Sequence, residues 1–500
     1  MQDYHLMVIL AVLCATVAAY LSRSWIFRKK QVLPYPPGPR ALPILGNVLD
    51  MRDARHCETL RRWKDDYGPI VHLKKRGNIY SSRPRLVMNE LEGWDDCIIT
   101  ILPYGPELRR SREKLHQFLQ PSVVQDYYPF QEQSAYGLAE SLLKDPENFL
   151  DVVKCSTAGL ITNVTYGYKV TSFSDPIVRL AEKGVEAFAD AQGFYLVNEL
   201  PWLQYLPSWL PGMGFLRTAK EASKTRVDMY QRPYEKFKEN LESGIGSSSF
   251  SARILESFRE KDGVVTHADE EFTAKLTSVV YAAGTDTTVS ALSTFILAMI
   301  LNPEVQRKAQ EEVDNVLGKN SLPTFADLPK LKYVDAVKKE CMRWQSVVQT
   351  SVPHVVTRDD EINGYFIPAN SVIMGNFWAI LRDPVEYPEP DQFKPERFIP
   401  SEGTNLPLDP GKVVFSVGRR FCPGKYFAEN SLFIDMATIF ATCNIGNTID
   451  DHGNPIIPKV EYTELFVRHP LPFKCSITPR NYDSLQLLRR ATDIGLPLGD

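Results

Sequence analysis

The 500-residue sequence contains only eight cysteines, and no two of them form a C-x-x-C pair. This argues against a zinc ribbon or a thioredoxin-type site, and the low cysteine density argues against a secreted disulfide scaffold. The chain also lacks an internal repeat, a flavin motif and the G-x-G-x-x-G dinucleotide fingerprint. Its net charge of −4 gives no indication of nucleic-acid binding, which favours a basic chain.

What the sequence does contain is an ordinary globular composition, with 44% hydrophobic and 24% charged residues. This composition excludes a disordered, collagenous or polytopic membrane protein. A chain of this length buries enough apolar surface to fold without disulfide bonds.

The N-terminus has the pattern of a membrane anchor. Residues 6–22 carry no charge, which is the short limit for a membrane-spanning helix, and four basic residues follow within 23–30. Because basic residues favour the cytosolic side, we predict a single transmembrane anchor with a basic flank at 1–30, a Pro-rich hinge at 31–48 and a cytosolic domain at 49–500. A cleaved signal peptide is the alternative, although the first residues lack the basic character of such a peptide.

The remaining sequence is mostly helical by periodicity. Strand-like runs are short, as at 69–73 and 365–374, and the segment 244–251 reads as a flexible surface loop. The pattern predicts a mainly α fold of the α+β type.

One long helix is predicted at 270–301, with Thr266 and Asp269 in position to cap its start. Its second half is almost entirely apolar, so a second membrane span is an alternative. Asp286 argues against that alternative, because an aspartate at the centre of a membrane costs about 2.5–3.5 kcal/mol. We expect a buried central helix instead.

The strongest local signal is the segment from Phe415 to Gly424, with the sequence FSVGRRFCPG. Gly418 and Gly424 permit tight turns, and Cys422 precedes a helix predicted at 425–443, whose N-terminus favours a thiolate. No histidine or cysteine stands nearby, so a metal held by Cys422 would bring its other ligands with it, as heme iron does. A nucleotide-binding loop fits poorly, because its Ser/Thr is replaced by tyrosine; a buried structural cysteine is the other alternative.

This segment resembles the heme-binding signature F-x-x-G-x-R-x-C-x-G of the cytochrome P-450 family of heme-thiolate monooxygenases. The resemblance implies heme b (iron protoporphyrin IX) as cofactor, O2 as co-substrate, and electrons from NADPH through a partner reductase. It implies that Cys422 is the axial iron ligand and that Arg420 pairs with a heme propionate. The other residues that it assigns to heme binding are Arg112, Phe415, Gly418 and Gly424.

Two further motifs resemble the family. Glu340-x-x-Arg343, together with Arg397 of a P-E-R-F segment, implies a buried charge network that holds the loop around Cys422; a solvated ion pair is the alternative. The segment 283–287 (AGTDT) resembles the oxygen-binding part of the family's long central helix. It implies that Asp286 and Thr287 relay protons during catalysis, the alternative being a threonine-rich helix segment.

A closer likeness is to fungal, membrane-anchored, O-methylsterigmatocystin oxidoreductase-like members, carried by the segments 80–84, 102–105 and 378–380. Two departures stand out. Leu108 replaces a tryptophan that precedes the propionate-binding Arg112 in the family. The junction at 74–76 is shorter than in similar proteins by roughly two dozen residues, which raises the alternatives of a mis-spliced gene sequence and of a catalytically impaired relic.

The resemblance implies a reductase-dependent monooxygenase anchored in the endoplasmic reticulum membrane by a single pass. Its partners would be an NADPH-cytochrome reductase, with cytochrome b5 as a further candidate, and an apolar small molecule, such as a terpenoid or polyketide of fungal secondary metabolism. A xenobiotic is the alternative substrate, and a heme-thiolate isomerase or dehydratase fits the Asp286–Thr287 pair less well. A basic docking face for the reductase, or else a solvated surface, is expected from Arg109, Arg110, Lys114, Lys412, Arg419 and Lys425.

Overall fold

The computed structural model describes residues 33, 34, 36, 37 and 80–493, except for residues 171, 173, 194, 319, 320, 402 and 404. The predicted anchor at 1–30, most of the hinge at 31–48, the strand-like run at 69–73 and the short junction at 74–76 lie outside the described residues.

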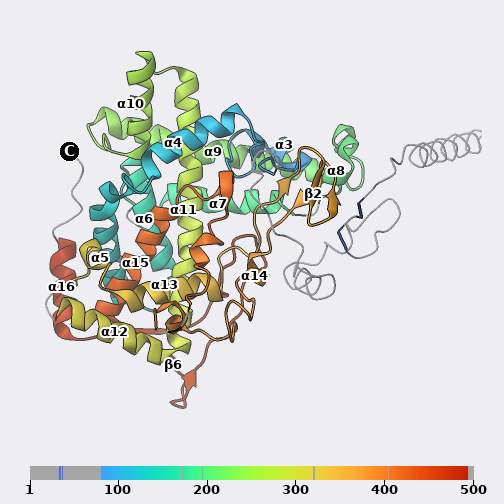
Figure 1. Ribbon diagram of the computed structural model, residues 1–500. Helices are drawn as coiled ribbons and strands as arrows, with labels where there is room; N and C mark the ends of the chain where they lie inside the picture. Colours follow the sequence, from blue (N-terminus) through green and yellow to red (C-terminus); the bar gives the residue numbers. More distant parts are fainter. Residues whose placement is uncertain are drawn as a thin grey trace, which may run out of the picture.

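Helices account for most of the described chain (Figure 1). The α-helices are α3 (Val87–Glu92), α4 (Pro106–Leu119), α5 (Tyr128–Lys144), α6 (Phe149–Tyr166), α7 (Pro176–Ala191), α8 (Leu196–Glu199), α9 (Phe215–Glu242), α10 (Phe250–Asp262), α11 (His267–Leu301), α12 (Pro303–Leu317), α13 (Lys332–Trp344), α14 (Phe377–Ile380), α15 (Lys425–Thr442) and α16 (Tyr482–Asp493). Short 3-10 turns connect them, among them η1 (Trp94–Asp96), η2 (Val124–Tyr127), η3 (Pro201–Tyr205), η4 (Phe325–Asp327), η5 (Pro395–Phe398), η6 (Pro410–Lys412) and η7 (Gly418–Arg420).

The strands of the described chain form small antiparallel pairs. They are β1 (His354–Val355), β2 (Asp360–Ile362), β3 (Tyr365–Ile367), β4 (Val372–Ile373), β5 (Cys443–Gly446), β6 (Thr448–Ile449), β7 (Pro455–Ile456) and β8 (Ser476–Pro479). The pairs are β1–β4, β2–β3, β5–β8 and β6–β7. The predicted run at 365–374 is therefore two strands, because the chain turns at Asn370, whose φ is 66°. The mainly α fold with small sheets is confirmed.

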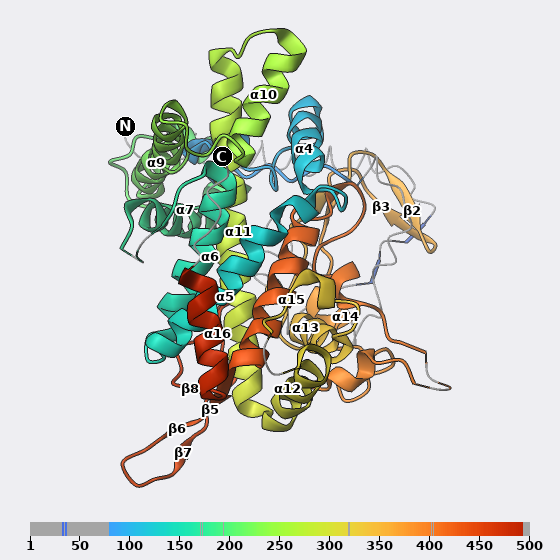
Figure 2. The same ribbon diagram turned by 90° about the vertical axis from the view of Figure 1, so that its left-hand side faces the viewer.

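Helix α11 runs through the middle of the molecule, with other helices around it in both views (Figures 1 and 2). Its start is fixed by a capping box in which the Thr266 side chain accepts from the Asp269 N–H and Asp269 accepts in return. Among the described residues it is the one helix apolar and long enough to cross a membrane, but 72% of its apolar window is buried. The prediction of a buried central helix, rather than a second span, is confirmed.

Two apolar cores pack on the two halves of α11. The half from Ala274 to Ala282 packs with residues of α4, α6, α9 and α10. The half from Val289 to Ile300 packs with residues of α5, α13 and α15, and the rings of Phe295 and Phe440 meet edge to face with centroids 5.3 Å apart. The two cores leave a short stretch of the central helix between them, and this stretch is the predicted segment 283–287.

The predicted loop at 244–251 is shorter and better anchored than expected. Helix α10 begins at Phe250, and Ser251 is fully buried in its first turn. Gly246 packs directly against Gly167, where a Cβ would lie 2.3 Å from the Gly246 Cα. The loop is therefore held by a close contact between two backbones, which only glycine permits at both positions.

Candidate heme-thiolate site

The burial of α11 is interrupted at its centre. Residues 276–279, 281, 282 and 288–300 are buried, whereas Ala283 is exposed and residues 284–287 are partly exposed. The hydroxyl oxygen of Thr285 is enclosed here without a hydrogen-bond partner among the described residues. An exposed alanine between two buried stretches of this helix indicates open space beside it, which we call the hollow.

The two predicted proton-relay residues make separate contacts. The Thr287 hydroxyl donates to the Ala283 carbonyl oxygen at 2.7 Å, which leaves its lone pairs free to accept. The Asp286 carboxylate accepts from His469 Nε2 at 3.0 Å. The described structure therefore places the acid and the alcohol next to each other on α11 without a hydrogen bond between their side chains, and it adds a histidine that the sequence alone did not indicate.

The segment before α15 forms a tight loop around Cys422. The Cys422 N–H donates to the Phe415 carbonyl oxygen at 2.7 Å, and Ser416 and Gly418 both have left-handed backbones, with φ of 61° and 67°. The predicted role of Gly418 in a tight turn is confirmed. Gly424 differs: its φ is −82°, so no left-handed turn requires glycine here, and a Cβ on it would meet the Cys422 Sγ at an ordinary contact distance of 3.9 Å.

The environment of the Cys422 sulfur corrects one expectation. Helix α15 begins at Lys425, with Gly424 as its N-cap, so Cys422 lies two residues before the cap. Burial raises the pKa of this thiol, while the Gly424 N–H, Arg112 and Lys425 act in the opposite direction. The helix N-terminus alone therefore does not make a thiolate, because burial outweighs it. The donors that surround the sulfur would favour a thiolate once a cation binds it.

Four basic groups are gathered close to this loop. Arg83 and Arg420 are buried, and Arg112 and His354 are partly buried. Burial, followed by the charge of Arg420, lowers the pKa of Arg83 to about 9, and burial, followed by the charge of Arg112, lowers the pKa of Arg420 to about 10. The pKa of His354 falls to about 4 because of burial and the charge of Arg83. Each shift has the sign expected for cations that repel one another.

No carboxylate of the described chain forms an ion pair with these guanidinium groups. Arg420 donates to the carbonyl oxygens of Ser81, Ile99 and Leu102, and Arg83 donates to other backbone carbonyls. Arg112 donates to the Phe421 carbonyl oxygen at 3.1 Å. Buried cations without a countercharge are costly, so this cluster fits an anionic group. The cluster and the single sulfur ligand together have the chemistry that a heme with its two propionates would need.

No group of three or more His, Cys, Asp and Glu residues in the described parts of the chain could hold a metal ion. A metal at Cys422 would therefore need a cofactor that carries the other ligands.

Comparison with known proteins decides the family. A family model described as Cytochrome P450 matches residues 72–477. The chain belongs to the cytochrome P450 family. Cytochrome P450 monooxygenase claR of Ampulloclitocybe clavipes is 36% identical, over 95% of this chain and 92% of its own length. Cytochrome P450 monooxygenase 208 of Postia placenta is 36% identical over 91% and 92%, and COX2 of Coprinopsis cinerea is 35% identical over 94% and 93%.

The alignment with claR spans 504 positions although it uses only 95% of this chain. The relative therefore carries residues without a counterpart in this P450. That they fall at the junction 74–76 stays a prediction.

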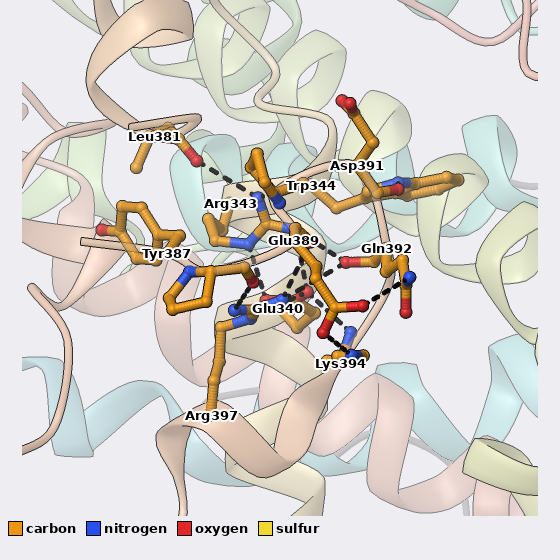
Figure 3. A network of polar contacts seen from close by, with 12 residues as sticks. Glu340, Arg343, Trp344, Leu381, Tyr387, Glu389, Asp391, Gln392, Lys394 and Arg397 are labelled. Atoms are coloured by element: carbon orange, nitrogen blue, oxygen red, sulfur yellow. Dashed lines mark hydrogen bonds and ion pairs between the residues drawn. The ribbon is translucent and has the colours of Figure 1, made fainter. Parts of the chain in front are cut away.

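The predicted charge network of this P450 is fully formed (Figure 3). Glu340 and Arg343 are completely buried and pair through two hydrogen bonds of 2.8 Å. The Arg397 Nε lies 3.2 Å from Glu340 Oε2, and the Lys394 N–H donates to Glu340 at 2.7 Å. The remaining donors of Arg343 reach the carbonyl oxygens of Leu381, Pro390 and Gln392. A solvated ion pair is thus excluded.

The network holds the segment 381–397 directly. The resemblance had implied that it holds the loop around Cys422. Its connection to that loop is indirect. Tyr387, whose ring lies 5.6 Å from the Arg343 guanidinium carbon, donates to the Leu408 carbonyl oxygen at 2.7 Å. Lys425, the first residue of α15, donates to the Gly411 carbonyl oxygen at 2.9 Å. The segment 408–411 therefore links the charge network to the cysteine loop.

The basic face expected for a reductase is smaller than predicted. Lys114 is buried and donates to Ser257 at 2.6 Å, and Arg110 pairs with Asp269. Lys114 folds inward, which a sequence does not reveal, whereas the Arg110 side chain stays 38% exposed beside its partner Asp269. Lys425 is mostly turned inward, towards Gly411. The exposed cations are Arg109, Arg419 and Lys412.

The sequence analysis assigned no role in the site to three residues that the structure places there: Arg83, His354 and His469. Arg83 stands in a segment quoted only for its likeness to fungal members. The two histidines are isolated in the sequence and gave no spacing signal. Leu108, the departure from the family pattern, is buried in the apolar core on α4, so the described chain offers no indole donor there.

Proposed function

We propose that this P450 inserts one oxygen atom from O2 into an apolar small molecule, with electrons delivered from NADPH by a separate reductase. The observation that carries the proposal is the buried Cys422, with the Gly424 N–H and the charges of Arg112 and Lys425 beside it, next to guanidinium groups that pair with no carboxylate of the described residues. The monooxygenase relatives support the reaction class.

The residues proposed to hold heme b are Cys422, as iron ligand, and Arg112 and Arg420, with the loop residues Phe415, Gly418 and Gly424 shaping the approach to the sulfur. Heme supplies the activation of O2 when it is bound. The protein supplies the rest. It excludes water with the two apolar cores, and it holds the cysteine loop closed by the Cys422 N–H to Phe415 contact.

Asp286 and Thr287 are proposed to move protons from solvent towards the hollow on α11. Their partial exposure permits exchange with water, and the carboxylate and hydroxyl are suited to accepting and passing on a proton. An apolar substrate is proposed because the hollow lies between two apolar cores. A terpenoid or polyketide of fungal secondary metabolism is the leading class, and a xenobiotic the alternative.

For the partners, we propose an acidic NADPH-cytochrome reductase docking near Arg109, Arg419 and Lys412, with cytochrome b5 as a further candidate. Arg109 and Arg419 both lie over the ring of Tyr104, at 6.0 and 5.6 Å. An endoplasmic reticulum anchor within residues 1–30, with the catalytic domain in the cytosol, is proposed from the sequence pattern alone.

The test supplies the full-length protein with a fungal reductase, NADPH and isotopically labelled O2, and offers a panel of terpenoids and polyketides. We expect a product that carries one labelled oxygen atom, loss of this product in Cys422→Ser, and its retention in the matched variant Cys475→Ser. Consumption of NADPH without any labelled product from the panel, in protein that has bound heme, would support the impaired relic instead.

A further inference from the structure

A hairpin near the C-terminus lies against the proton-relay segment of α11. Its two arms meet at the bridge between Tyr462 and Pro470. Thr463 and His469 face each other across it, with the Thr463 N–H donating to the His469 carbonyl oxygen at 2.8 Å and the His469 N–H donating to the Thr463 hydroxyl at 3.0 Å. We call residues 462–470 the C-terminal hairpin.

Three side chains spaced four residues apart on α11 hold the C-terminal hairpin. Asp286 accepts from His469 at 3.0 Å, the Ser290 hydroxyl donates to the Arg468 carbonyl oxygen, and Thr294 shares a hydrogen bond of 3.1 Å with the Tyr462 hydroxyl. Residues four apart lie on one face of a helix, so the contacts form a single polar stripe. This stripe ends at Asp286, next to the hollow.

The contact at Asp286 differs from the other two, because it involves the group assigned to proton transfer. A carboxylate offers only acceptor oxygens, so this contact requires the His469 tautomer that carries its hydrogen on Nε2. The contact occupies Oδ1, and no other hydrogen bond to this side chain occurs among the described residues. About a quarter of each side chain is exposed, so water reaches the pair.

We propose that His469 is a positioning residue: it holds one oxygen of Asp286 and thereby aims the other oxygen for proton transfer along α11. The proposal rests on the proposed function of Asp286. The hairpin supplies the rigidity, since the His469 backbone is fixed on both sides by Thr463. Without the histidine, the Asp286 side chain can turn to another rotamer, and protons reach the hollow from water in an uncontrolled order.

The expected consequence is a change in the products that receive the NADPH electrons. In the coupled reaction, NADPH, a proton, O2 and a substrate C–H give NADP+, water and the hydroxylated product. When Asp286 no longer directs proton delivery, NADPH, a proton and O2 give NADP+ and hydrogen peroxide, and the substrate is unchanged. Both reactions balance with the same oxidant and reductant, so the peroxide share of NADPH consumption measures the positioning directly.

The test compares wild type with His469→Leu, His469→Gln and Asp286→Asn in the full-length, heme-containing protein. The matched control is His452→Leu, an exposed histidine in the turn between β6 and β7. Two readouts are recorded: amide hydrogen exchange of residues 462–470, measured without turnover, and the peroxide share of NADPH consumption.

We expect His469→Leu to speed exchange in the hairpin by about tenfold, as the loss of a charge-assisted hydrogen bond implies. It should also raise the peroxide share to the level of Asp286→Asn, and combining the two changes should add nothing. His469→Gln, which keeps a donor, should restore most of the coupling, and His452→Leu should match wild type.

Faster exchange with an unchanged peroxide share in His469→Leu, while Asp286→Asn raises that share, would overturn the proposal and leave His469 as a structural anchor. Unchanged exchange and an unchanged share would also overturn it. If Asp286→Asn itself leaves the share unchanged, the proton role of Asp286 fails and the positioning role fails with it, whereas heme binding by Cys422 is judged separately by its spectrum.

Discussion

At the scale of single residues, the molecule contains several ionisable groups whose burial disfavours the charged form and so shifts the pKa. Glu92 is an example remote from the cysteine loop. Its carboxyl is almost completely enclosed, with 1% of the residue exposed, and it accepts from the Trp94 indole N–H at 2.6 Å. Burial raises its pKa to about 7, and the Trp94 hydrogen bond acts in the opposite direction.

This shift predicts a pH dependence of stability. Between about pH 4.5 and about pH 7, folded Glu92 holds a proton that the unfolded chain has released, so its contribution to stability is present at low pH and is lost as the pH rises. Glu92→Gln keeps the acceptor for Trp94 without the charge. We expect the variant to gain about 1–3 kcal/mol of unfolding free energy over wild type at about pH 8, and little at about pH 5.

Urea unfolding of both proteins at the two pH values measures the effect. Glu113→Gln, at an exposed position on α4, is the control and should show no such difference between the two pH values. A Glu92→Gln protein that is no more stable than wild type at the higher pH would contradict the shift.

At the scale of elements, the buried charge network joins α13 to the segment 381–397. Glu340→Gln removes the negative charge that Arg343 and Arg397 share while leaving the shape nearly unchanged. Removing one partner of a buried pair typically costs about 3–5 kcal/mol. We expect a loss of this size in unfolding free energy, measured by denaturant titration.

The chain carries a natural control for this change, because Glu304 and Arg307 on α12 have the same spacing on an exposed surface. Glu304→Gln should cost at most about 0.5 kcal/mol, as exposed pairs do. Equal losses at the two sites would show that burial does not set the strength of the Glu340 pair.

The contact between Gly167 and Gly246 joins the end of α6 to the turn before α10. Gly167 has a φ of 64°, and an alanine there would place its Cβ against the Gly246 backbone. We expect Gly167→Ala to lower the unfolding free energy by about 2 kcal/mol or more, from backbone strain and overpacking together.

Gly137→Ala on α5 is the matched substitution, and we expect it to change stability in the opposite direction. A Cβ at this position meets nothing within 4 Å, so the substitution should stabilise the protein by about 0.5–1 kcal/mol. Thermal unfolding of both variants gives the comparison, and a stabilised Gly167→Ala protein would contradict the close contact.

At the scale of the whole molecule, the sequence predicted the parts that depend on local pattern. The α11 cap, the buried central helix, the turn at Gly418 and the Glu340–Arg343–Arg397 network all follow from residues close in sequence or from a family motif. The cation cluster of Arg83, Arg112, Arg420 and His354 depends on segments that meet only in the folded chain. The same holds for the His469 contact and for the inward turn of Lys114, which no periodicity reveals.

The central claim is that Cys422 binds heme iron as a thiolate. The most direct measurement is the absorption spectrum of the reduced, full-length protein under carbon monoxide, recorded for wild type and Cys422→Ser. The account predicts the red-shifted band of thiolate-ligated heme in wild type and its loss in the variant. A histidine-type band in wild type, or the thiolate band persisting in Cys422→Ser, would contradict it.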